Sequence, residues 1–296
     1  MTTDLLKYKE TDLIFMDIET AREYKEISTD HPKFHTFRLK MRDRDTDELP
    51  SEEETKELYN KKAGLYPIYS RIVCITMGFI SKDKIYLKTF SGEEKDILTD
   101  TVNTLKENAG KTLVWWNQAF DLPAIRQRFI LNGLTGYLPD NIGNDSMKKP
   151  WTLKGTLDLM DVWKGIRYSS DSLGEVSVAL GLSNPKEGDV EGSQVSEVYH
   201  EEGDAKIIKY CERDVSALIN IYRKFTYKEI IEEIIIKTGK KQKQKHNIFQ
   251  KLALDMIPTE KEQATLDARI ESLEGEEKVI ALELVAAAKH REKPMW

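Results

Sequence analysis

The chain has 296 residues, of which 40% are hydrophobic and 32% are charged, and its formal net charge is −6. This composition excludes wholesale disorder, and the length allows one large domain or a domain with an appendage. No apolar run is long enough to span a bilayer and no signal peptide opens the chain, so we expect a cytoplasmic protein without membrane contact. The acidic excess falls on residues 1–226, which argues against nonspecific electrostatic binding of nucleic acid but does not exclude a nuclease.

Short apolar runs predict strands in the first half of the chain. The candidates are residues 12–18, 71–80, 84–90 and 112–117, and residues 153–163 begin with a further strand-like run. A polar insertion at about residues 30–66 is longer than a usual connection. It contains a predicted helix that opens with a capping box of Ser51 and Glu54 and ends at Gly64.

Amphipathic patterns predict helices further along the chain. They cover residues 93–110, 122–133, 172–182 (with Ser172 as N-cap) and 206–225. Because helices interleave with strands, we expect a three-layer α/β domain over residues 1–226, with helices flanking a mixed central sheet. The composition changes near its end, and residues 227–296 are predicted as a helical C-terminal extension. In this extension a helix continues or restarts at residue 227, and Thr259 and Glu262 form a further capping box.

The two cysteines, Cys74 and Cys211, lie in apolar contexts without CxxC or Cys/His spacing. We therefore predict buried thiols in a reducing compartment, and neither a zinc site nor a disulfide. His200, in "VYHEEGD", is interpreted as a loop residue and not as a catalytic base.

Two acidic motifs lie at the ends of predicted strands. Asp17 and Glu19 end the first strand, where alternation places them on one face and a divalent cation would relieve their mutual repulsion. The alternative is a strand end that simply enters solvent. Asp121 follows a strand that ends at Asn117, and it is either part of a site or the N-cap of the next helix.

A third motif lies on the predicted helix at 206–225. Tyr210 and Asp214 are one turn apart, and Asp214 falls at the edge of the apolar sector. A carboxylate near a core requires a partner, a hydrogen bond or a metal, although an Asp that caps or salt-bridges at the helix flank is an alternative. The opposite, outward-facing arc is predicted to hold Lys209, Glu212, Arg213, Ser216, Asn220 and Arg223.

Together these motifs supply four hard oxygen ligands without a catalytic Ser, Cys or His constellation. Such a set suits two Mg²⁺ or Mn²⁺ ions. Two such ions about 4 Å apart stabilise the attacking and leaving oxygens of a phosphoryl displacement.

The ordered set "DIE", "NQAFD" and "YCERD" resembles the DEDD superfamily of 3′–5′ exonucleases, which have a DnaQ-like, ribonuclease H-like fold. It is most similar to the DEDDy branch, near the proofreading domain of family B DNA polymerases and its stand-alone relatives. "LYPIYSRIVCITMGF", "TLDLMDVW" and "SSDSLGEVSVALGL" are also similar in order and spacing, so the resemblance covers about residues 10–226. Lys209 stands where the histidine branch has its His. "NQAFD" is one residue shorter than is usual in the polymerase domains.

The resemblance implies a role for each motif residue. Asp17 would bridge both metals, and Glu19 and Asp214 would ligate the metal that holds the nucleophilic water. Asp121 would support the second metal, and Tyr210 would align the nucleophile.

The expected function is that of a metal-dependent 3′–5′ exonuclease that releases nucleoside 5′-monophosphates from single-stranded or frayed DNA. Thr20, Asn117 and Phe120 are candidates for substrate contact. The alternatives are an exoribonuclease of the same branch, or a silent module that binds nucleic acid or a replication partner; the complete set of acids argues against the silent module. The C-terminal helices are candidates for self-association or for docking to a replication protein.

Overall fold

The computed structural model describes residues 5–134, 155–166, 171–186 and 190–237. Contacts divide the chain into two compact units, Met1–Gly239 and Lys240–Trp296, and all described residues belong to the first. The capping box predicted at Thr259 and Glu262 lies outside the described residues, as do the C-terminal helices predicted to mediate self-association or docking.

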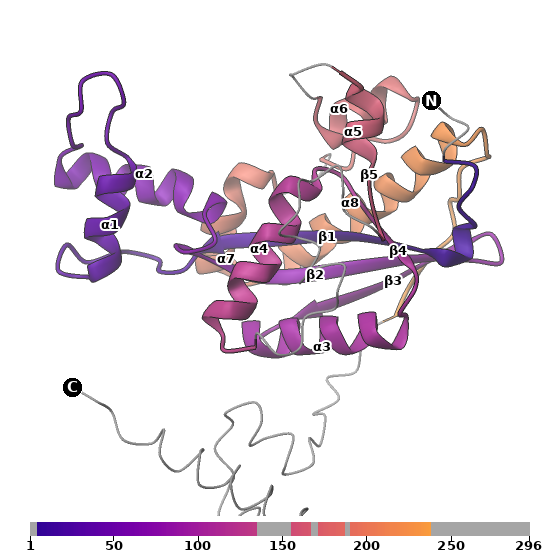
Figure 1. The fold of residues 1–296 in the computed structure, drawn as a ribbon, viewed down its shortest axis with the longest axis horizontal. Coiled ribbons are helices and arrows are strands. Elements are labelled where there is room, and N and C mark those ends of the chain that lie inside the picture. Colours follow the sequence, from indigo (N-terminus) through magenta and orange to yellow (C-terminus); the bar gives the residue numbers. More distant parts are fainter. Residues whose placement is uncertain (1–4, 135–154, 167–170, 187–189, 238–296) are drawn as a thin grey trace, which may run out of the picture. The chain divides into compact units, whose positions relative to one another are not determined.

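Six strands of the described residues form one sheet in the order β5-β4-β1-β2-β3-β6 (Figure 1). The strands are β1 (Leu13–Arg22), β2 (Ser70–Ser81), β3 (Lys84–Ser91), β4 (Thr112–Trp115), β5 (Thr156–Asp158) and β6 (Ile234–Ile236). β2 pairs antiparallel with β1 and with β3, whereas the other three pairings are parallel. Parallel pairing requires crossover connections, whose helices cover the sheet. The predicted mixed sheet is therefore confirmed.

Helices cover both faces of this sheet. In Figure 1, α4 (Gln118–Leu131) crosses in front of the sheet and α3 (Glu94–Glu107) runs along its lower side, whereas α8 (Ala205–Phe225) packs behind it on β1, β2 and β3. Gly78 of β2 permits a close approach of α8, because a Cβ at this position would lie 2.6 Å from Val215 Cγ1 and 2.8 Å from Ile219 Cδ1. Helix, sheet and helix form the three predicted layers.

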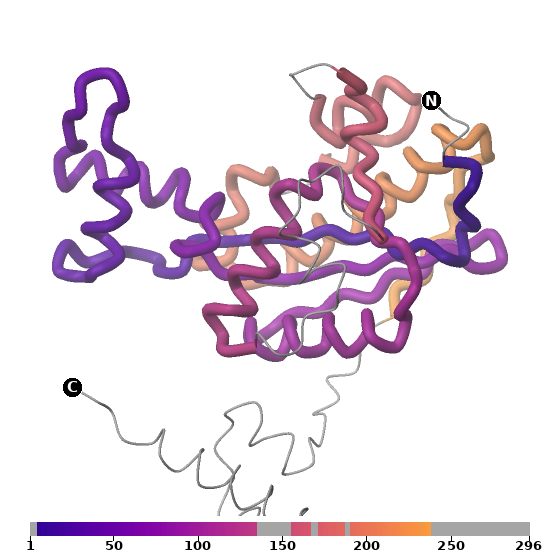
Figure 2. The backbone as a smooth tube through the Cα atoms, viewed as in Figure 1, coloured from indigo at the N-terminus to yellow at the C-terminus, as the bar shows by residue number. Residues whose placement is uncertain are grey.

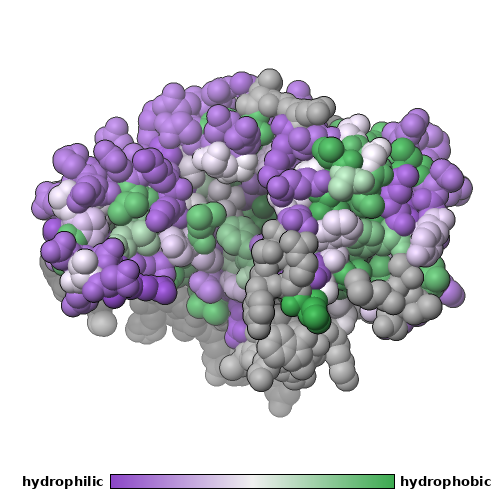
Figure 3. Space-filling view, turned by 90° about the horizontal axis from the view of Figure 1, so that it is seen from above, coloured by the Kyte–Doolittle hydropathy of each residue, from purple (hydrophilic) through white to green (hydrophobic). Residues whose placement is uncertain are grey.

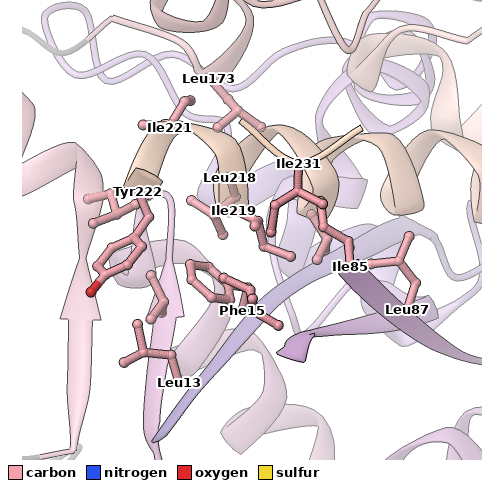
Figure 4. Close-up of a cluster of buried hydrophobic side chains, with 14 of the residues drawn as sticks. Leu13, Phe15, Ile85, Leu87, Leu173, Leu218, Ile219, Ile221, Tyr222 and Ile231 are labelled. Carbon is pink, nitrogen blue, oxygen red and sulfur yellow. The ribbon is translucent and has the colours of Figure 1, made fainter. Parts of the chain in front are cut away.

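A large cluster of buried apolar side chains lies between α8 and the sheet (Figure 4). Leu218, Ile219 and Tyr222 project from α8 toward Phe15 of β1, and the Phe15 and Tyr222 ring centroids are 5.5 Å apart. Burial of one such side chain stabilises the fold by roughly 1.5–3 kcal/mol. This packing holds α8 in a defined register against β1, and it thereby positions the polar residues of the same helix.

The insertion between β1 and β2 forms a small lobe, which the tube in Figure 2 follows out of the sheet and back. It contains α1 (Pro32–Lys40) and α2 (Glu52–Lys62), which pack around aromatic rings. The predicted capping box of Ser51 and Glu54 is confirmed at the start of α2. The prediction that Gly64 ends this helix is wrong, because α2 ends at Lys62 and Gly64 lies in the following 3-10 turn at Ala63–Leu65.

The chain after α8 does not continue as a helix. Tyr227 adopts a left-handed φ of 58°, and β6 then joins the edge of the sheet beside β3. The helix predicted from residue 227 is therefore wrong over the described residues. Consecutive isoleucines fit either period, and pairing with the distant β3 decides for a strand.

Short elements lie between β5 and α8. In the described part of the strand-like run, Thr156–Asp158 is a strand, and α5 (Leu159–Lys164) follows at once. α6 (Leu173–Ala179) has its predicted N-cap at Ser172. α7 (Val195–Glu202) contains His200, so the prediction that His200 lies in a loop is wrong.

Three residues predicted to face outward from α8 are buried instead. Glu212 accepts a hydrogen bond from Thr89 Oγ1 at 2.9 Å, and Arg223 pairs with Glu10. Ser216 donates to the backbone oxygen of Glu212. The prediction failed because distant segments cover this arc of the helix: β3 packs on α8 beside Glu212, and Glu10 lies against Arg223. No helix among the described residues is long and apolar enough to cross a membrane.

Candidate metal-dependent active site

β1 brings two carboxylates to the face of the sheet that α8 covers. Asp17 pairs with Thr76 and Glu19 with Cys74 in the antiparallel ladder, and the register shifts directly after Glu19. Such a bulge bends a strand and re-aims its side chains. Along β1 this face changes from the buried ring of Phe15 to two acids that keep some exposed surface. The two carboxylates therefore lie where the core reaches solvent.

α8 places Tyr210 and Asp214 opposite these acids. Both side chains are buried, and the Tyr210 hydroxyl is hydrogen-bonded to the Asp214 carboxylate. Asp214 Oδ1 is buried without a hydrogen-bond partner among the described residues. The negative charge of Asp214 acts on both Asp17 and Glu19. An unpartnered buried carboxylate oxygen is unfavourable unless a proton or a cation binds to it.

Asp121 reaches the cluster from α4. The helix begins at Gln118, after Asn117 in a left-handed conformation with a φ of 71°, so the interpretation of Asp121 as the N-cap is wrong. Asp121 lies one turn inside the helix and is 4% exposed. The backbone N–H of Ile18 hydrogen-bonds to its carboxylate and to that of Asp17. Asp121 thus faces the same segment of β1 that carries the first acids.

Asp158 is part of the site that sequence reasoning missed. Its carboxylate accepts hydrogen bonds from the backbone nitrogens of Asn117 at 3.0 Å, Gln118 at 2.9 Å and Met160 at 3.0 Å. It therefore caps the start of α4 as well as that of α5. The sequence contained a signal for this residue, because Asp158 is the acid that ends the strand-like run "TLD". In the sheet this strand pairs with β4, the strand that leads into the Asn117 turn. Asp158 positions Asp121 through the backbone.

The five carboxyl groups share one electrostatic feature. Burial raises the pKa of Asp17, Glu19, Asp121 and Asp158, and neighbouring acids raise these values further. For Asp214, burial raises the pKa from 3.8 to about 7, although Lys186 and the Tyr210 hydrogen bond oppose the shift. Closely spaced acids with raised pKa values take up protons or cations. Carboxylate oxygens are the donors that Mg²⁺ and Mn²⁺ prefer, so these residues fit such ions.

The three candidate substrate residues occupy different positions. The Thr20 hydroxyl donates to the Gly64 backbone oxygen at 2.7 Å, which ties the lobe to β1 beside Glu19. Asn117 caps α4 without a side-chain capping bond, and Phe120 is partly exposed directly before Asp121. Seen from above, the surface is hollowed between the hydrophilic lobe and the part that carries α5 and α6 (Figure 3). No described contact assigns a substrate role to these three residues.

Residues 65–264 match the model of a family described as a predicted 3′–5′ exonuclease related to the exonuclease domain of PolB. The match covers more than half of the chain. It includes Asp121, Asp158, Tyr210 and Asp214, and it begins after the strand that holds Asp17. No curated protein matches the chain.

Proposed function

The chain belongs to this family of predicted 3′–5′ exonucleases, and we propose that it hydrolyses phosphodiester bonds at the 3′ end of single-stranded or frayed DNA. The products are nucleoside 5′-monophosphates. Its six-stranded mixed sheet with flanking helices is the ribonuclease H-like fold expected for this family. The observation that carries the proposal is the cluster of four buried or half-buried acids around β1, with Tyr210 hydrogen-bonded to one of them.

In this proposal Asp17, Glu19, Asp121 and Asp214 hold two divalent cations, Mg²⁺ or Mn²⁺. When bound, such ions activate water and stabilise charge on the phosphate and on the leaving oxygen. Asp17 is coupled to each of the other acids, because the charge of Asp214 acts on Asp17 and the charge of Asp17 acts on Glu19 and Asp121. Asp17 would therefore be the residue that contributes to the binding of both ions.

Tyr210 is proposed to orient the attacking water. Burial, together with the charge of Asp214, raises the pKa of Tyr210, so its hydroxyl stays protonated over the working pH range. A neutral hydroxyl beside Asp214 can donate and accept a hydrogen bond without adding a fifth negative charge to the four acids. Asp158 acts indirectly, because it holds the start of α4 and with it the direction of Asp121.

The test uses single-stranded DNA and RNA of one sequence, labelled at the 5′ end, with Mg²⁺, Mn²⁺ or EDTA. We expect shortening from the 3′ end that requires metal, and faster shortening of DNA than of RNA. Asp17→Asn should abolish cleavage while retaining the wild-type melting temperature or exceeding it. Asp12→Asn is a matched control, since Asp12 is an exposed acid just before the same strand.

Undiminished cleavage by Asp17→Asn, or cleavage in EDTA, contradicts the proposal. Faster shortening of RNA would reassign the substrate and leave the site intact. Absence of any cleavage, with both ions and both substrates, would favour a silent binding module.

A further inference from the structure

A thiol lies among the carboxylates of the proposed metal site. Cys211 of α8 is fully buried, and its Sγ is 3.3 Å from Asp17 Oδ2 and 3.6 Å from the Asp17 backbone oxygen. One donor atom each from Asp17, Glu19 and Cys211 all lie within 4.8 Å of one another. Cys74 lies beside them, because it pairs with Glu19 across the sheet and is hydrogen-bonded to the Cys211 thiol. The donors that converge here are therefore oxygen and sulfur together.

A second observation points to a cation at this position. Asp214 is 8% exposed, and its Oδ1 accepts no hydrogen bond from the described residues. Its charge acts on both Asp17 and Glu19, so the carboxylate lies near these two acids. The cluster thus contains an unpartnered oxygen besides its three converging donors.

We propose that Asp17, Glu19 and Cys211 form a mixed oxygen–sulfur site that binds thiophilic divalent cations, Zn²⁺ and Cd²⁺, more tightly than Mg²⁺. A tetrahedral Zn²⁺ with Zn–S near 2.3 Å and Zn–O of 2.0–2.2 Å places these two donors about 3.5 Å apart. The observed separation of Cys211 Sγ and Asp17 Oδ2 is 3.3 Å, so the donors need little rearrangement. Asp214 lies near this group with an unpartnered Oδ1, but the converging set consists of the other three donors.

The chemistry of the donors sets the preference for these ions. Thiolate ligands select soft or borderline ions, whereas Mg²⁺ takes oxygen ligands and gains nothing from sulfur. As the metal–sulfur bond forms, the S–H bond of Cys211 breaks and its proton passes to the buffer. The ions reach the site past Asp17 and Glu19, which keep exposed surface. The inference departs from the prediction that the cysteines form no zinc site, whereas both thiols are free and buried as predicted.

The consequence for activity rests on the proposed function. An ion bound to Cys211 occupies the position that the nuclease requires for Mg²⁺ or Mn²⁺. Zn²⁺ and Cd²⁺ should therefore inhibit cleavage, and an excess of Mg²⁺ should not restore the activity.

The test is a titration of the metal-free full chain with Cd²⁺, followed by the ultraviolet charge-transfer absorption of a cadmium–thiolate bond. The chain contains only Cys74 and Cys211, so this band reports on these two sulfurs and not on a histidine site elsewhere. We expect a saturable band that excess Mg²⁺ does not remove and that Zn²⁺ removes by competition. Cys211→Ala should lose the band, and Cys74→Ala should keep it.

Loss of a residue that contacts a metal ligand without binding the metal lowers metal affinity by about 10- to 100-fold. Cys211→Ala removes a ligand itself, so its Cd²⁺ affinity should fall by more than this. Cys211→Ser provides a second variant if the alanine protein does not fold. Absence of the band in the wild type overturns the inference, and so does its persistence in Cys211→Ala. Mg²⁺-dependent cleavage measured on the same protein separates the two proposals. Cleavage without a band rejects only the sulfur site, and a band without cleavage rejects only the nuclease.

Discussion

Replacement of Asp214 by Asn should stabilise the metal-free protein at alkaline pH and abolish its cleavage of nucleic acid. The carboxylate is buried beside Asp17 and Glu19, and its Oδ1 has no hydrogen-bond partner among the described residues. Asn keeps the shape and one oxygen, and it removes the charge that burial disfavours. The same charge is needed to hold a cation, so stability and activity should change in opposite directions.

The magnitude follows from the pKa of Asp214, which burial raises from 3.8 to about 7. Below pH 3.8 the carboxyl is protonated in the folded and unfolded chains, and its contribution to stability is fully present. As the pH rises through about 7, the folded state must give up the proton and that contribution is lost. The loss is about 4 kcal/mol at pH 8, since one pKa unit corresponds to about 1.4 kcal/mol.

The assay is urea unfolding in EDTA at a series of pH values between about 4 and 8, where paired carboxyl groups titrate. The free energy of unfolding of Asp214→Asn should exceed that of the wild type at pH 8 and equal it near pH 4. Asp204→Asn is the control, because Asp204 precedes the same helix, is partly exposed and makes no capping bond. Its stability should follow the wild type throughout. An Asp214→Asn protein that is no more stable than the wild type at pH 8 would refute the reasoning.

Three further predictions concern positioning. Tyr210→Phe should lower the cleavage rate by about 100-fold, which is the cost of a misplaced reactant. Mg²⁺ should still raise the melting temperature of this variant as it does in the wild type, and loss of that rise would indicate that Tyr210 is a metal ligand. Asp158→Ala should lose about 3 kcal/mol or more in urea unfolding, because three N–H groups lose their acceptor. Asp161→Ala, at an exposed position of α5, should lose under about 1 kcal/mol; equal losses would contradict the capping role. Gly78→Ala should cost about 1–3 kcal/mol by overpacking and should also slow cleavage, because α8 must shift; unchanged kinetics would show that the shift does not reach the site.

Much of the fold was predictable because local patterns and tertiary packing agree. Ser51 and Ser172 open helices with capping boxes, and the apolar period of α8 matches the face it buries. β6 was not predictable, because the isoleucines near residue 234 adopt a strand only through pairing with β3. The buried side of α8 was also underestimated. Glu212 became internal because Thr89, more than 100 positions earlier, supplies its hydrogen bond.

For the site, spacing along single elements predicted which acids face the same way. Alternation placed Asp17 and Glu19 on one face, and the helical turn paired Tyr210 with Asp214. Spacing within one element says nothing about contacts between elements. The capping of α4 by Asp158 joins positions 40 or more apart, and the Cys211 thiol meets Asp17 only after α8 docks on β1. Both features depend on packing that no local pattern contains.

The distance along the chain between the two halves of this site has a consequence for biosynthesis. The contact between Asp17 and Cys211 spans 194 positions, and α8 is the last helix of the described residues. Because contacts between distant segments form late, a growing chain carries isolated acids and no assembled cluster until α8 has emerged and packed. We therefore expect ribosome-bound fragments that stop before residue 205 to be inert toward nucleic acid. Nuclease activity would begin only after the core is complete. An incomplete chain would therefore not cleave its own messenger RNA or other nucleic acids nearby.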